Sequence, residues 1–157
     1  MLRKSLLISL LVLVTAVVAT AGDKAGDQAW FDKSCAMCSN MYSNEGLIEH
    51  MSWEQLDLRN GIISITTVDE KYLPDYRKAK MGMMETMAKM QSGEELHICG
   101  SCQYLGKCMM QGPDQDYVQT STGDIMILTS GDEELVAELQ KWVAKNKEAK
   151  EKMAKKG

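Results

Sequence analysis

The fold is decided by residues 53–68, which read WEQLDLRNGIISITTV. Two β-prone runs flank Asn60-Gly61, and an Asn-Gly pair in this setting is the strongest short-range signal for a β-hairpin. A two-residue turn would place the apolar side chains on one face and the polar side chains on the other. We therefore expect Leu58 to pair with Ile63 and Leu56 with Ile65 on a core face. Asp57 and Ser64, and Gln55 and Thr66, would pair on the wet face.

The same pattern returns 62 residues later, and self-similarity of this kind indicates a repeated unit. Gly61, Ile63, Ile65, Thr67 and Leu73 recur as Gly123, Ile125, Ile127, Thr129 and Leu135. The second hairpin, around Gly123, has a more apolar outer face that we expect to be covered. The chain thus reads as two tandem αββα repeats, residues 29–91 and 94–145. This order predicts an α+β fold with a mainly antiparallel sheet and helices packed on one face, with a ferredoxin-like arrangement as an option.

Helical signals surround these hairpins. The spacing predicts helices over residues 35–42, 75–91 and 100–110 and from about Asp132 onward, and a strand over residues 95–99. In the second of these helices, Tyr76, Met83, Met87 and Met90 lie on one side, which we interpret as a buried stripe. Ser34 is the expected N-cap of the first helix, so Cys35 would lie where the helix dipole favours a thiolate.

The N-terminus resembles a targeting segment. Arg3 and Lys4 precede an apolar run from Leu6 to Val18 and the small residues 19–21, which is the pattern of a signal peptide. The run is too short to cross a bilayer, which takes about 20 apolar residues. We expect residues 1–21 to be removed, residues 22–145 to form one domain, and residues 146–157 to be a basic helix end or tail. The expected location is periplasmic or extracellular, without stable membrane insertion after cleavage.

Charge argues against a nucleic-acid partner. Residues 1–21 hold two of the 18 basic residues and none of the 22 acidic ones, so the remaining chain carries a net charge of −6. Phosphate binding needs a concentrated basic surface. The one basic run, residues 145–156, is interrupted by glutamates and suits the negative end of a helix dipole.

The sharpest chemical signal is a pair of CxxC motifs, Cys35-Ala36-Met37-Cys38 and Cys99-Gly100-Ser101-Cys102. Two such motifs can supply the four sulfur ligands that Zn²⁺ takes in tetrahedral sites. Sixty residues separate them, but closing a long loop costs only about 0.6 kcal/mol per doubling of its length. Methionines near the cysteines also suit Cu(I), which soft sulfur ligands select. We therefore predict a site for Zn or Cu(I).

Other residues could add to that site. His97 precedes Cys99 by two residues and is a candidate ligand, although a strand histidine with a backbone partner is the plainer interpretation. Cys108 is the odd fifth cysteine and a further candidate. His50 follows apolar residues and is better read as structural.

The sequence leaves three functions open. The leading hypothesis is an exported soluble metal-binding protein that carries its ion or is stabilised by it. The first alternative is a thiol-disulfide or sulfur-transfer protein using the same cysteines. The second is a disulfide-stapled module that binds a protein partner, because thiols oxidise outside the cytosol. No arrangement of Ser, His and Asp and no phosphate-binding loop indicates an enzyme.

Overall fold

A computed structural model describes residues 29–155. This part of the chain is an α+β structure with one four-stranded antiparallel sheet and four α-helices, as expected for the fold class. The elements follow in the order α1 (Ser39–Tyr42), η1 (Ile48–His50), β1 (Met51–Leu58), β2 (Gly61–Val68), η2 (Glu70–Tyr72), α2 (Leu73–Gln91), α3 (Gly100–Met109), β3 (Asp114–Gln119), β4 (Gly123–Thr129) and α4 (Glu133–Ala154). The expected signal peptide, residues 1–21, lies outside the described residues.

The two hairpins form the sheet by pairing their second strands. The strand order is β1-β2-β4-β3, with β2 and β4 antiparallel at the centre. Gly61 faces Thr129 and Thr67 faces Gly123 across that central pair. In the repeat, Gly61 corresponds to Gly123 and Thr67 to Thr129, each 62 residues later, so these two facing pairs are equivalent. The pairing is therefore symmetric about Ser64 and Met126, which face each other. A ferredoxin-like order, β-α-β-β-α-β, does not occur in residues 29–155.

The first hairpin turns one residue earlier than the sequence predicts. Leu58 pairs with Gly61, and Leu56 with Ile63, so the turn consists of Arg59 and Asn60. The predicted pairs, Leu58 with Ile63 and Leu56 with Ile65, are therefore wrong by two residues. The physical reason lies in β4, because a Cβ on Gly61 would come 1.9 Å from the carbonyl oxygen of Leu128. Gly61 is needed for close approach of a neighbouring strand and not for the turn.

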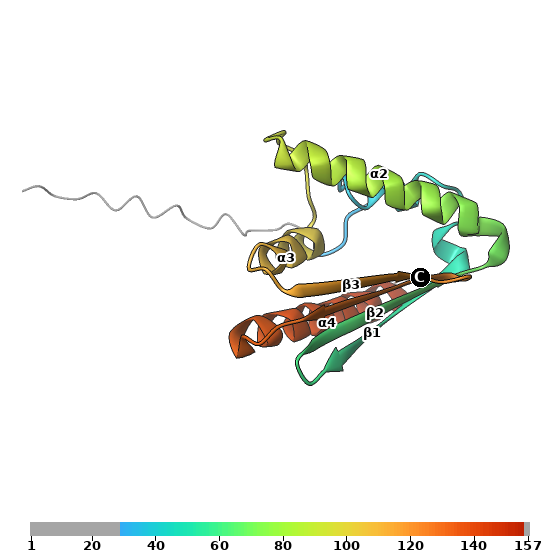
Figure 1. Ribbon diagram of the computed structural model, residues 1–157. Helices are drawn as coiled ribbons and strands as arrows, with labels where there is room; N and C mark the ends of the chain where they lie inside the picture. Colours follow the sequence, from blue (N-terminus) through green and yellow to red (C-terminus); the bar gives the residue numbers. More distant parts are fainter. Residues whose placement is uncertain (1–28, 156–157) are drawn as a thin grey trace, which may run out of the picture.

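The predicted core face of the first hairpin is also wrong. Ile62 is fully buried and Gln55 is 5 % exposed, whereas Leu56 is 41 % exposed. The face that carries Ile62 is covered by α4, which runs along the sheet behind the strands in Figure 1. The second hairpin agrees with expectation, since Leu128 on its outer face is fully buried and Met126 packs beside it. Helices thus pack on one face of the sheet. It is the face that the alternation of residues in β1 predicted to be exposed to solvent.

A buried polar network joins this core to three other segments. Asn146 of α4, which is 1 % exposed, donates from Nδ2 to Gln55 Oε1 at 3.0 Å. Its Oδ1 accepts from Trp30 Nε1 at 2.8 Å and from Ser101 Oγ at 2.9 Å. Trp142 Nε1 donates to the Ser101 carbonyl at 3.1 Å. The network explains why a glutamine is buried on β1 and fixes α4 against β1, α3 and the N-terminal segment.

Helix α2 is buried only in its first half. Tyr76 and Ala79 are 3 % exposed and pack against Leu47 and Val68. The expected burial of the methionine stripe is wrong, because Met87 is 48 % and Met90 is 40 % exposed. The second half of α2 has only the short helix α1 beside it, with Thr86 accepting a hydrogen bond from Asn40 Nδ2. The apolar side of α2 therefore extends beyond the part of the structure that covers it.

The predicted strand at residues 95–99 does not form. The segment between α2 and α3 has no regular structure, and its contacts with other segments include a backbone hydrogen bond from Ala36 N–H to the His97 carbonyl at 2.8 Å. A strand needs a partner strand along its length, and both edges of the sheet lie elsewhere. In residues 29–155 no helix is long and apolar enough to cross a membrane.

Candidate metal centre

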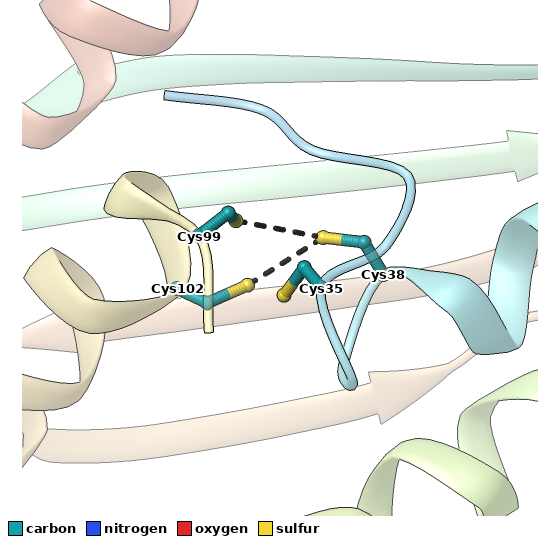
Figure 2. A group of neighbouring side chains, drawn as sticks. All are labelled: Cys35, Cys38, Cys99 and Cys102. Carbon is teal, nitrogen blue, oxygen red and sulfur yellow. Dashed lines mark hydrogen bonds between the residues drawn. The ribbon is translucent and has the colours of Figure 1, made fainter. Parts of the chain in front are cut away.

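Four cysteines from two distant segments meet at one point. Cys35 and Cys38 lie in the loop that leads into α1, and Cys99 and Cys102 lie at the start of α3. Figure 2 shows their sulfur atoms turned toward one another across the gap between these segments. The four Sγ atoms all lie within 4.8 Å of one another, close enough to hold a metal ion.

The spacing of the sulfurs matches a single tetrahedral ion. Cys38 Sγ lies 3.6 Å from Cys102 Sγ and 3.8 Å from Cys99 Sγ. Zn–S bonds of about 2.3 Å place the sulfurs of a tetrahedron ~3.8 Å apart. These separations are far longer than the S–S bond of about 2.05 Å in a disulfide, and all five cysteines are free thiols. The site therefore fits one ion with four sulfur ligands.

Backbone hydrogen bonds hold the two loops in place. Ala36 N–H donates to the His97 carbonyl, which couples the first CxxC motif to the segment before the second. Gly100 and Ser101 donate their N–H groups to the carbonyls of Ala29 and Trp30, at 3.1 and 3.0 Å. The loops are thus crosslinked by main-chain contacts that do not depend on the sulfurs.

The cysteine at a helix start is not the expected one. α1 begins at Ser39, so Cys35 precedes it by a turn and is not at its N-terminus. Cys99 instead occupies the N-cap position of α3. The prediction that Cys35 is primed by a helix dipole is therefore wrong. The dipole argument applies to Cys99, and the backbone N–H of Cys102 in the first turn of α3 helps to lower the pKa of the Cys99 thiol.

Mutual hydrogen bonds divide the protons among the thiols. The thiol of Cys102, the backbone N–H of Cys102 and the thiol of Cys38 all donate toward Cys99, and they lower the pKa of Cys99. The bond from Cys102 to Cys38, together with the bond to Cys99 and burial, raises the pKa of Cys102. The bond from Cys102 lowers the pKa of Cys38, but the bond to Cys99 and burial outweigh it and raise that pKa. Of these three thiols, Cys99 is therefore the one whose ionised form is favoured.

The other candidate ligands lie outside this group. His97 Nε2 is 2.7 Å from Asp32 Oδ2, so that nitrogen is engaged by the carboxylate, and His97 is not one of the residues grouped around the possible ion position. Cys108 is 2 % exposed and belongs to the core formed by Ile62 and Leu128. His50 pairs with Asp69 at 2.7 Å and stacks on Tyr72 with ring centroids 4.3 Å apart.

Asp32 is a residue of this region that the sequence analysis overlooked. Its Oδ1 accepts from both the backbone N–H and the hydroxyl of Ser34, at 2.8 Å each, and so shapes the turn that presents Cys35. The bond to His97, followed by the bonds from Ser34, lowers the pKa of the Asp32 carboxyl. An aspartate two residues before a serine is a recognisable Asx-turn signal, so the turn could have been found, although its histidine partner could not.

Comparisons with models of protein families, with curated protein sequences and with solved structures give no match for this chain.

Proposed function

We propose that this chain is an exported protein stabilised by one Zn²⁺ ion bound to Cys35, Cys38, Cys99 and Cys102. The observation that carries the proposal is the approach of all four sulfurs to within 4.8 Å of one another. Four thiolates at tetrahedral corners favour zinc or an iron-sulfur centre over harder ions. Because all four ligands come from the protein, no position is left for a substrate, which is typical of structural zinc and not of catalytic zinc.

The surroundings support a stabilising role. Cys35 and Cys99 are fully buried and form, with Ile98, the smallest of the three buried clusters. Two of its three buried residues are thus proposed ligands. Residues 29–38 and 92–99 contain neither helix nor strand, so they lack the regular backbone hydrogen bonding of secondary structure. An ion at this point would join both segments and attach them to the start of α3.

Metal analysis of purified protein tests the proposal. We expect about one zinc per chain after dialysis against a weak chelator, and a loss of thermal stability when a strong chelator removes it. Cys38→Ser and Cys102→Ser alter ligands that are partly exposed, so these variants should still fold at low temperature while losing the ion. Cys108→Ala is the matched control, because Cys108 is a buried cysteine outside the group, and it should keep the metal. Full zinc content in both ligand variants would contradict the proposal.

Copper is tested in the same preparation. Met37 packs against the buried cysteines, and a thioether beside thiolates is a ligand combination that suits Cu(I). Competition between zinc and Cu(I), with the bound ion identified by elemental analysis, decides between the two. We expect zinc to occupy the site because four sulfurs are available at tetrahedral spacing.

A thiol-disulfide exchange protein is the second candidate. It is favoured by one observation, the lowered pKa of Cys99 beside the partly exposed thiols of Cys38 and Cys102. Such a protein would contain no metal, and one dithiol would react rapidly and reversibly with a disulfide reagent. Intact mass and thiol counting on the freshly purified chain separate the two candidates.

We further propose that the chain arose by duplication and that residues 1–21 direct its export. The order α-β-β-α occurs twice, and each copy contributes one CxxC motif, which supports the first idea. The basic and apolar N-terminus supports the second. N-terminal sequencing of the secreted protein should begin near Gly22.

A further inference from the structure

Within residues 29–155, one face of the sheet is left without a covering layer. Alternation along the strands puts the side chains of Ile63 and Ile127 on the side opposite Ile62 and Leu128, which α4 covers. Leu56 is 41 % and Val118 is 50 % exposed. None of the apolar residues on this side belongs to a buried cluster of the described chain. We call this surface the open face; its apolar residues are Leu56, Leu58, Ile63, Ile65, Val118, Ile125 and Ile127.

The open face has two apolar rows that cross the strands. The strand pairing gives one row as Leu56, Ile63, Ile127 and Asp116, and the other as Glu54, Ile65, Ile125 and Val118. Each row therefore ends in a carboxylate, at opposite edges of the sheet. The pattern is two-fold symmetric, because Glu54 and Asp116 differ by the same offset of 62 that relates Leu56 to Val118.

The charge on this sheet has a single sign. The four strands contain five acidic residues, Glu54, Asp57, Asp114, Asp116 and Asp124, and no lysine or arginine. Of these, Glu54, Asp114 and Asp116 share the open face by their register. The lysines lie mainly on the helices of the other side, as in α4. An apolar centre with an acidic border complements a surface that is apolar in the middle and basic at its edges.

A second copy of the chain does not fit this surface. Stacking two open faces would bring carboxylates into a dry interface that supplies no cation, which is costly. An anionic membrane is also disfavoured, because its charge has the same sign as the carboxylates and repels them. A helix on the open face, by contrast, would pack on the sheet as α4 does on the other face. The sheet would then be the middle layer of a three-layer arrangement.

We propose that the open face binds an amphipathic helical segment of another protein, with its apolar stripe on the isoleucines and its lysines or arginines at Glu54 and Asp116. The binding is independent of the metal centre, since α3 and its cysteines lie on the covered side through the contacts of Tyr104 and Cys108 with Ile62 and Leu128. The partner class follows from apolar area and charge alone.

A pair of synthetic peptides tests this proposal on the full chain. The probe is an amphipathic helix of leucine and lysine, and its counterpart has glutamate in place of lysine. Titration followed by amide chemical shifts should place the lysine peptide on β2 and β4 and show weak or no binding of the glutamate peptide. Glu54→Lys should lower the affinity for the lysine peptide several-fold. Glu54→Lys combined with Asp116→Lys should lower it by about tenfold and should raise the affinity for the glutamate peptide.

The matched control is Asp57→Lys, which makes the same charge change on the same strand with its side chain on the other face. It should leave the affinity for the lysine peptide within about twofold. Equal binding of both peptides, or equal effects of Glu54→Lys and Asp57→Lys, would overturn the proposal. So would a concentration-dependent dimer that protects β2 and β4, or binding of anionic lipid vesicles through this face. Metal content should be unchanged in every variant.

Discussion

Two glycines in the central strand pair show how a single atom can constrain the sheet. A Cβ on Gly61 would lie 1.9 Å from the Leu128 carbonyl oxygen, and one on Gly123 would lie 2.0 Å from the Thr66 carbonyl oxygen. Both obstacles are backbone atoms, which cannot move aside as a flexible side chain can. The closeness of β2 and β4 therefore depends on the absence of side chains at these two positions.

Gly61→Ala should lower the free energy of unfolding by about 1–3 kcal/mol, because overpacking forces the strands apart. Gly106→Ala is the control, since nothing lies within 4 Å of a Cβ at that helical position. It should be neutral or stabilise the protein by up to about 1 kcal/mol. Urea unfolding followed by circular dichroism measures both, and equal stabilities of the two variants would show that the strand contact has been misjudged.

The cysteine protons predict how metal affinity depends on pH. The raised pKa values of Cys102 and Cys38 mean that these thiols are protonated near neutral pH and must lose their protons to the solvent when an ion binds. Zinc affinity should therefore rise by at least about a hundredfold per pH unit below these pKa values, one factor of ten for each proton released. Competition with a coloured chelator at two pH values measures the slope.

Cys108→Ala should keep this slope, because its thiol is not among the ligands. An affinity that does not change with pH would mean that all four thiols are already ionised in the free protein, contrary to the hydrogen bonding between them.

At the scale of elements, the network around Asn146 connects α4 to β1, α3 and the N-terminal segment. Asn146→Ala would leave Gln55, Trp30 and Ser101 without their shared partner in a buried setting. An unsatisfied buried polar group costs about 1–3 kcal/mol, so we expect a loss of at least about 2 kcal/mol in unfolding free energy. The exposed neighbour Lys147→Ala should change it by less than about 0.5 kcal/mol. Denaturant unfolding of both variants checks the contrast.

The elements themselves were mostly readable from the sequence, and their mutual arrangement was not. Periodicity and turn residues are local, so the two hairpins and the helices could be predicted within a few residues. The register of β1 with β2 depends on how closely β4 approaches Gly61, and the buried face of β1 depends on Asn146, 91 residues after Gln55. Residues 95–99 have the composition of a strand but no strand beside them.

At the scale of the whole molecule, α2 is tied to the sheet through one buried carboxylate. Tyr76 of α2 donates to Asp124 Oδ2 at 2.5 Å, Tyr117 donates to the same oxygen, and Lys80 Nζ lies 3.4 Å from it. Burial first, and then the bond to Asp124, raises the pKa of both tyrosines above the usual value of about 10. The folded protein therefore favours their neutral forms.

This arrangement predicts a loss of stability in alkali. A group whose pKa is raised by folding contributes stability that is complete below its unfolded pKa, here about 10, and that declines as the pH rises beyond it. Unfolding free energy should fall as the pH rises from about 10 to about 12, and the fall should be smaller in Tyr117→Phe, which has no proton to lose. A stability that rises over that interval would contradict the assignment.

The meeting of the two CxxC motifs could be anticipated for a chemical reason, since four soft ligands in one chain suggest a common ion. The roles of the individual cysteines could not. Which sulfur lies at a helix start depends on where α1 begins, and that in turn depends on the turn formed by Asp32 and Ser34. The open face could not be predicted from the sequence, because its isoleucines alternate with other residues in the same way as the buried residues of a core strand.

The separation of the ligands along the chain also sets when the centre can be assembled. In the proposed export the N-terminus would leave the channel first, and Cys35 and Cys38 would reach the new compartment while sixty residues still separate Cys38 from Cys99. Until then half of the ligand set exists, and its two thiols are open to oxidation or to other ions. Under the proposed export, an ion held by all four sulfurs could not travel with the unfolded chain and would be acquired at the destination, late in maturation.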